Sequence, residues 1–132
     1  MATVDKKLDK LCSEYVRKRA IQRCGGCERC NTPKFDIVKD NGSVFPAWKS
    51  LDWSHFHTRS NKKVRWNEDN AAGLCGGCHF YLDSHPHEKI AFFEGLLGDK
   101  VTQLEYQATR GSKPDKSAIE LYLKQKIKEL DV

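Results

Sequence analysis

The chain has 132 residues, of which 39% are hydrophobic and 31% charged, a balance that suits one globular domain over 1–132 and excludes wholesale disorder. Lys and Arg number 23 against 18 Asp and Glu, and the formal net charge of +5 mildly favours a polyanionic partner. No apolar run approaches the length that crosses a bilayer, and the N-terminal sequence lacks the apolar region of a secretory signal. We therefore expect a cytoplasmic protein without a membrane partner.

The first predicted element is a helix over residues 5–22, where apolar side chains recur at helical spacing opposite a face rich in Lys and Arg. After Gly25-Gly26 the pattern changes to short extended segments. The sequence Asp40-Asn41-Gly42 predicts a tight turn, and residues 51–56 predict a short strand. Residues 61–63 predict an exposed basic loop.

The second half of the sequence is predicted to be helical. Apolar spacing and the punctuation at Pro86, Gly98 and Gly111 divide it into four helices. These helices span about residues 74–82, 86–97, 100–109 and 116–130. The predicted fold class is α+β, with helices around a small two-stranded unit and a C-terminal helical extension over about 100–130.

Four of the six cysteines form two pairs with the spacing of zinc ligands. Cys27-Glu-Arg-Cys30 and Cys75-Gly-Gly-Cys78 each place two thiolates around a tight turn, and together they supply the tetrahedral set that structural zinc prefers. A redox Cys-x-x-Cys site is the alternative, which the presence of a second pair disfavours. We expect a structural Zn²⁺ that contributes to folding.

The two remaining cysteines are less favoured as zinc ligands. Cys24 also forms a Cys-x-x-Cys pair with Cys27, so it is either an alternate ligand or a spare thiol. Cys12 lies within the first predicted helix, where we expect it to be a buried apolar residue.

Three segments, in this order, resemble the HNH endonucleases, and more narrowly the small zinc-bearing HNH proteins of phages and prophages. They are Asp52-Trp-Ser-His55-Phe, Arg65-Trp66-Asn67-Glu-Asp-Asn70 and Leu74-Cys75-Gly-Gly-Cys78-His79, joined by Arg59 and by the upstream knuckle Cys27-Glu-Arg-Cys30-Asn. The resemblance covers about residues 24–97. It implies a ββα-metal finger, held by the four-cysteine zinc site and flanked by the N- and C-terminal helices.

The resemblance implies a metal-dependent nuclease, and the chemistry of the residues agrees with it. His55 is the candidate general base, because a neutral imidazole can take a proton from the water that attacks phosphorus. His79 directly follows a zinc knuckle and is the candidate ligand of a catalytic divalent cation, most simply Mg²⁺ or Mn²⁺. The resemblance gives Asn70 the role of holding the loop between the two histidines by backbone hydrogen bonds.

One position departs from the family pattern. Many members carry a metal-binding acid or His directly before the general base, and this chain has Ser54 before His55. Asp83 is the replacement ligand that spacing favours, because it lies four residues after His79 on the same face of a helix. Asp52 is a weaker candidate.

The remaining histidines have alternative interpretations. His57 shares a face with His55 if the strand is regular, so it could replace His55 as the base. His85 and His87 flank Pro86 at a helix start, where solvated or capping roles are more common than metal ligation. A second metal site formed by these two histidines with Asp83 is the less favoured alternative.

Basic residues cluster between the two catalytic segments, where a phosphate backbone would have to pass, although an ordinary surface loop is the alternative. The predicted DNA contacts are Arg59, Lys62, Lys63 and Arg65. We therefore predict an endonuclease that hydrolyses phosphodiester bonds in DNA and nicks with low sequence specificity. The resemblance also implies phage packaging or recombination proteins as partners. A zinc-stabilised nucleic-acid-binding module with an inactive nuclease site is the main alternative, and a thiol redox protein is a weaker one.

Overall fold

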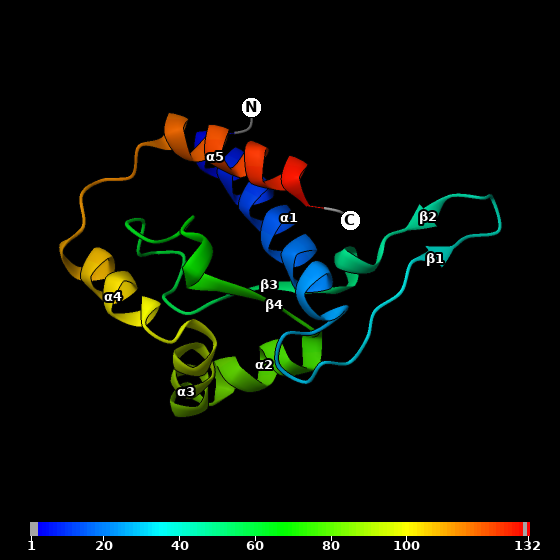
Figure 1. Ribbon diagram of the computed structural model, residues 1–132, viewed down its shortest axis with the longest axis horizontal. Helices are drawn as coiled ribbons and strands as arrows, with labels where there is room; N and C mark the ends of the chain where they lie inside the picture. The colour runs from blue at the N-terminus through cyan, green and yellow to red at the C-terminus, as the bar shows by residue number, and fades with distance from the viewer. Residues whose placement is uncertain (1–2, 131) are drawn as a thin grey trace.

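A long N-terminal helix lies across a two-stranded sheet, and the C-terminal helix packs beside it (Figure 1). The computed structural model describes residues 3–130 and 132. Helix α1 (Val4–Cys24) begins at Thr3, whose hydroxyl accepts a hydrogen bond from the Lys6 amide at 3.1 Å. It ends at Gly25, which has a φ of 73°, a left-handed conformation that favours glycine at helix ends. The predicted helix is therefore confirmed.

The sheet beneath α1 is an antiparallel pair of β3 (Asp52–His55) and β4 (Ala71–Leu74), in a register that places Asp52 opposite Leu74. All four residues of β4 are buried. A Cβ atom at Gly73 would lie 2.7 Å from the Cβ atom of Ala20, so glycine is needed where α1 crosses this strand. Strand β3 was predicted, whereas β4 was not, because Ala-Ala-Gly has little intrinsic preference for strands.

Four helices follow the sheet, close to the predicted ranges. They are α2 (Gly76–Ser84), α3 (Pro86–Leu97), α4 (Lys100–Arg110) and α5 (Lys116–Glu129). Two short 3₁₀ helices, η1 (Ala47–Ser50) and η2 (Glu68–Asn70), precede the two strands of the sheet. Figure 1 shows α2 and α3 below the sheet and α5 above it. Mixed helices and small sheets agree with the α+β prediction.

Buried side chains form separate clusters around the sheet, and both clusters include residues of α1. One joins α1, α5 and the β3–β4 connection, and includes Leu8, Trp66 and Leu123. Another joins the sheet to α2 and α3 around Phe93, whose ring stacks on that of Phe56 at a centroid distance of 5.0 Å. Two of the predicted zinc ligands belong to this second cluster, so the expected metal site borders a hydrophobic core. These two ligands are Cys27 and Cys78.

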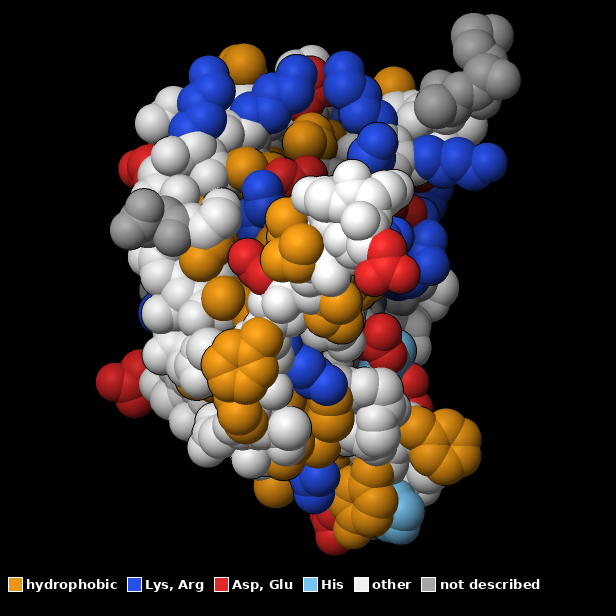
Figure 2. Space-filling model, turned by 90° about the vertical axis from the view of Figure 1, so that its right-hand side faces the viewer, with side chains coloured by type: hydrophobic (Ala, Val, Ile, Leu, Met, Phe, Trp, Pro, Cys, Tyr) orange, Lys and Arg blue, Asp and Glu red, His pale blue; other side chains and the backbone are white. Residues whose placement is uncertain are grey.

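A short hairpin of β1 (Ile37–Val38) and β2 (Val44–Phe45) projects from the side of the molecule (Figure 1). The predicted turn at its tip is confirmed, with Gly42 at a φ of 84°. Figure 2 views the molecule from this side and shows hydrophobic side chains exposed among Lys, Arg and acidic residues. Within the described residues, no helix is both long enough and apolar enough to cross a membrane.

Candidate metal centre and polar site

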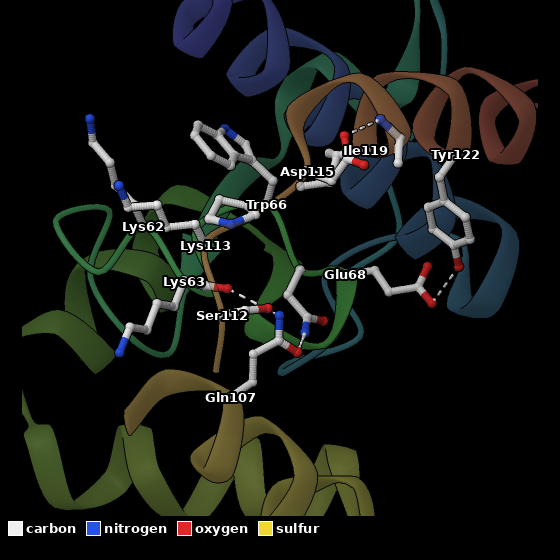
Figure 3. A pocket seen from close by; sticks show the side chains of 13 residues that line it. Lys62, Lys63, Trp66, Glu68, Gln107, Ser112, Lys113, Asp115, Ile119 and Tyr122 are labelled. Atoms are coloured by element: carbon white, nitrogen blue, oxygen red, sulfur yellow. Dashed lines mark hydrogen bonds between the residues drawn. The ribbon is translucent and has the colours of Figure 1, made fainter. Parts of the chain in front are cut away.

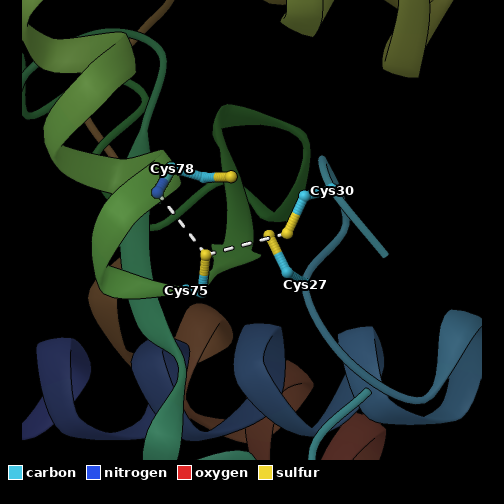
Figure 4. Close-up of side chains that lie close together, drawn as sticks. All are labelled: Cys27, Cys30, Cys75 and Cys78. Carbon is cyan, nitrogen blue, oxygen red and sulfur yellow. Dashed lines mark hydrogen bonds between the residues drawn. The ribbon is translucent and has the colours of Figure 1, made fainter. Parts of the chain in front are cut away.

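The four predicted zinc ligands lie together at the start of α2 (Figure 4). Their sulfur atoms are all within 4.8 Å of one another, and those of Cys30 and Cys75 are 3.8 Å apart. A tetrahedral zinc with Zn–S bonds of about 2.3 Å requires sulfur atoms roughly 3.8 Å apart. The cluster of Cys27, Cys30, Cys75 and Cys78 therefore fits a structural metal such as zinc.

The thiols of this cluster differ in acidity, which affects how a metal would bind. Burial raises the pKa of Cys27 and raises that of Cys78 to about 12. Hydrogen bonding to Thr32 lowers the pKa of Cys30 to about 6. A bound cation would favour the thiolate form of every ligand, so metal binding would release protons. Arg29 adds a positive charge, donating to the Cys78 sulfur at 3.5 Å.

Glu28 attaches the first knuckle to the sheet. Its backbone amide donates to the Gly73 carbonyl at 3.0 Å, and its carboxylate accepts from the Gly73 amide at 2.8 Å. The second knuckle follows β4 directly in the chain, and the Cys75 sulfur caps α2 by accepting from the Cys78 amide at 3.5 Å. Both pairs are thus placed by β4 and its extension, and no sequence pattern singled out Glu28.

The structure distinguishes the two remaining cysteines from the cluster. Cys24 is exposed, and its thiol lies within hydrogen-bond range of the Ala20 carbonyl at 3.4 Å, so it belongs to the end of α1. Cys12 is fully buried, as predicted, and burial raises its pKa to about 12. The choice of Cys27 with Cys30 as the first pair agrees with this geometry.

Asn70 holds the connection between β3 and β4 by hydrogen bonds to its backbone. Its side-chain oxygen accepts from the His57 amide at 2.8 Å, and its side-chain nitrogen donates to the His57 carbonyl at 3.0 Å. Asn70 is fully buried, and its own carbonyl accepts from the Phe56 amide at 2.8 Å. These contacts are of the kind that the resemblance implied.

His55 lies at the end of β3, and its side chain is almost completely enclosed. The residue is 8% exposed, its ring centroid is 4.0 Å from that of Trp53, and its Nε2 atom has no hydrogen-bond partner among the described residues. Burial, with a smaller contribution from the positive charge of Arg59, lowers the pKa of His55 to about 4. The imidazole is therefore neutral at pH 7 and keeps a lone pair.

This depressed pKa predicts a pH-dependent contribution to stability. Between pH 4 and pH 6.5 the unfolded chain binds a proton that folded His55 does not, so the free energy of unfolding should rise with pH across this window. From pH 5 to pH 7, His55→Gln should show a rise smaller than that of the wild type by about 2 kcal/mol. Urea unfolding of both proteins at several pH values measures the difference. Parallel curves would show that His55 titrates normally.

His79 points its two ring nitrogens at two different carboxylates. Its Nδ1 atom is 3.0 Å from Asp52 Oδ2, and its Nε2 atom is 3.3 Å from Asp83 Oδ2. The other oxygen of Asp83 is 2.8 Å from the ammonium group of Lys89. About a third of the His79 side chain and half of each carboxylate are exposed, so water has access to the group. Spacing favoured Asp83, and the structure also brings Asp52 to this histidine.

The other histidines lie apart from this group. Strand β3 ends at His55, and the His57 ring instead pairs with Glu105 of α4, with Nε2 2.7 Å from Oε1. His85 lies 2.8 Å from the Tyr81 carbonyl through Nδ1 and stacks on the Tyr81 ring. Within the described residues, the four cysteines are the only group of three or more His, Cys, Asp or Glu close enough to share an ion, so Asp83, His85 and His87 are not gathered.

Each residue predicted to contact DNA has a partner inside the chain. Asp9 of α1 accepts from Arg59 at 2.8 Å and from Arg65 at 2.6 Å and 3.0 Å. Lys62 is 3.1 Å from Asp5. Lys63 donates to the Thr109 carbonyl at 3.2 Å. Arg65 and Asp9 are mostly buried, so this pair primarily fastens the β3–β4 connection to α1.

No protein-family model matches the chain, and comparisons with curated proteins and with solved structures find no significant match. The HNH assignment therefore stays a prediction from the sequence motifs.

Proposed function

We propose that the protein is a metal-dependent DNA endonuclease of the HNH type, in which β3, β4 and α2 form the ββα-metal finger. The observation that supports this best is the double hydrogen bond of Asn70 to the His57 backbone. It fixes the connection between the strand that carries His55 and the strand that leads to His79. A catalytic constellation needs its parts held rigidly, and this contact would hold the two histidine-bearing segments in register.

His55 is the general base in this proposal. Burial keeps it neutral, and its unpaired Nε2 atom would accept the proton from water once substrate binding opens this enclosed position to the attacking water. A pKa of about 4 makes the resting imidazole a weak base. A bound phosphate would raise this pKa, because a nearby negative charge stabilises the imidazolium. The base would therefore gain strength when DNA binds.

His79 and Asp83 fit a site for a hard divalent cation. With a cation bound, Nδ1–H would donate to Asp52 and the Nε2 lone pair would face the cation beside Asp83. A carboxylate on the far side of a ligating histidine is the usual means of fixing its tautomer and orientation. Two protein donors with open access to water suit Mg²⁺ or Mn²⁺, which would neutralise charge on the phosphate and the leaving oxygen. Asp52 thus orients the histidine, and Asp83 supplies the metal donor that Ser54 does not.

A zinc-stabilised nucleic-acid-binding module with an inactive site is the second candidate. Two observations favour it: the predicted cation site has only two protein donors among the described residues, and Arg59 and Arg65 are already paired with Asp9. Both candidates require nucleic-acid binding, and they differ in cleavage.

Incubation of supercoiled plasmid with the purified protein tests the proposal. We expect conversion to nicked plasmid with Mg²⁺ or Mn²⁺ and none with EDTA, after confirming that EDTA leaves the zinc content unchanged. Salt-sensitive DNA binding without cleavage under any metal would establish the binding module and refute the nuclease.

A further inference from the structure

A groove lined by lysines runs between the β3–β4 connection and the linker that precedes α5. It consists of two adjoining hollows of about 510 and 660 Å³, which share Lys62, Lys63 and Lys113. Figure 3 shows these lysine side chains gathered at one end of the first hollow, and Lys116 lines the second. We call the region bounded by these four residues the lysine groove. Lys113 and Lys116 lie outside the segment that resembles HNH proteins.

Positive charge in the groove is only partly neutralised. Lys62 and Lys116 share the single carboxylate of Asp5, at 3.1 and 2.8 Å. Lys63 donates to an uncharged backbone carbonyl, and Lys113 is exposed and forms no ion pair within the described chain. Glu68 and Asp115 also line the first hollow, so the four lysines face three carboxylates with Asp5, and the groove keeps an excess of one positive charge that a polyanion can use.

Hydrogen bonds within the chain hold the walls of the groove in place without a ligand. The Asn61 side chain donates to the Ala108 carbonyl at 3.1 Å, and Gln107 donates to the Lys63 carbonyl at 3.1 Å. Asp115, at the edge, caps α5 by accepting from the Ala118 amide at 3.1 Å, as Figure 3 shows. A fixed lysine-bearing loop loses less conformational entropy on binding than a mobile one.

We infer that the lysine groove binds the phosphate backbone of DNA, with Lys113 and Lys116 from the C-terminal extension contacting the strand beside Lys62 and Lys63. This inference rests on the proposed function, since it takes DNA as the ligand. Lysine ammonium groups act as point charges that suit successive phosphates without reading bases. Trp66 in the wall of the groove is 3% exposed, so its ring offers no open face on which a free base could stack.

The position of the groove gives the C-terminal extension a role. The β3–β4 connection starts next to His55, contains Lys62 and Lys63, and meets α4 and the linker to α5. DNA held in the groove would follow this connection away from the catalytic residues. The two lysines of the extension would then lengthen the footprint on the backbone rather than take part in cleavage.

Fluorescence anisotropy with a labelled duplex of about 20 base pairs, at about 50 to 200 mM NaCl, tests the inference. Lys113→Gln/Lys116→Gln should weaken binding about tenfold and reduce the slope of log K against log salt by about 2, the loss of two phosphate contacts. The matched control is Lys100→Gln/Lys128→Gln, which removes the same charge from exposed positions elsewhere. The control should stay within about threefold of the wild type with an unchanged slope.

If both double variants bind the duplex equally more weakly, the loss of affinity follows from net charge alone, and the inference is overturned. Displacement of the duplex by micromolar ATP or pyrophosphate, at matched ionic strength, would assign the groove to free nucleotides and also overturn it. If the groove variant binds the duplex more weakly but the wild type never nicks plasmid, DNA binding in the groove is supported and the nuclease is refuted. If the wild type nicks plasmid but the groove variant binds the duplex normally, the nuclease is supported and DNA binding in the groove is refuted.

Discussion

Removal of the metal from the four-cysteine cluster is expected to lower the free energy of unfolding by about 5 kcal/mol or more. Binding of a structural zinc is worth about 10–16 kcal/mol in small zinc domains, against a total stability of about 5–15 kcal/mol for an ordinary domain. A loss of this size corresponds to a fall in Tm of roughly 15–20 °C for a chain of this length. Thermal unfolding by circular dichroism, with and without a strong zinc chelator, measures it.

Cys78→Ser should have the same effect without a chelator. Cys78 belongs to the hydrophobic cluster around Phe93, so the variant loses one metal ligand and also places a hydroxyl group among apolar neighbours. Cys24→Ser is the matched control, because Cys24 is exposed and lies outside the cluster. Elemental analysis should find one zinc per chain in the wild type and in the control. A metal-free protein with an unchanged Tm would contradict the prediction.

The loss of structure on metal removal should affect mainly one half of the molecule. The four-cysteine cluster joins the turn after α1 to the start of α2, whereas the core around Leu8 and Leu123 contains none of these cysteines. Glu28 pairs with Gly73 and would hold the first knuckle near β4 for as long as the strand itself is formed. Loss of α2 and β4 would also release His79, so metal removal should abolish any nuclease activity.

Local signals in the sequence identified most of the elements. The helix ends could be predicted because glycine, at Gly25 and Gly98, favours the end of a helix and proline, at Pro86, favours its first turn. The cysteine spacing was equally informative, because two ligands on one turn must be close in sequence. Strand β4 was missed because its stability comes from burial and pairing with β3, and not from the preferences of Ala and Gly.

Interactions between distant segments could not be predicted. Asp9 accepts hydrogen bonds from Arg59 and Arg65, which are 50 and 56 positions away, and this links both predicted DNA contacts to α1. Glu105 pairs with His57, 48 positions away, and nothing in the sequence around either residue indicates this contact.

The two carboxylate partners of His79 show the same division between local and distant contacts. Asp83 was predicted near His79 because helical spacing is local. Asp52 was ranked lower because the pairing partner of β3 was unknown, and it is this pairing that brings Asp52 beside the start of α2.

His79→Ala and His55→Ala should each lower the rate of plasmid nicking by about 10²–10⁴-fold, the range that a general base or an equivalent catalytic group contributes. His79 supplies one of two protein donors to the proposed cation, and its loss leaves Asp83 paired with Lys89. His55 is the neutral, unpaired imidazole. Both variants require a check of zinc content and unfolding, because His55 is buried.

His57→Ala separates catalysis from the position of the loop. Asn70 binds only the backbone of His57, so the variant keeps both of these hydrogen bonds and loses the pair with Glu105. We expect it to nick plasmid within about tenfold of the wild type, and Glu105→Gln should behave in the same way. A loss of about 10²-fold or more in His57→Ala, with His55→Ala fully active, would move the general base to His57. In that case Glu105 would orient the base, and α4 would belong to the catalytic site rather than only to its support.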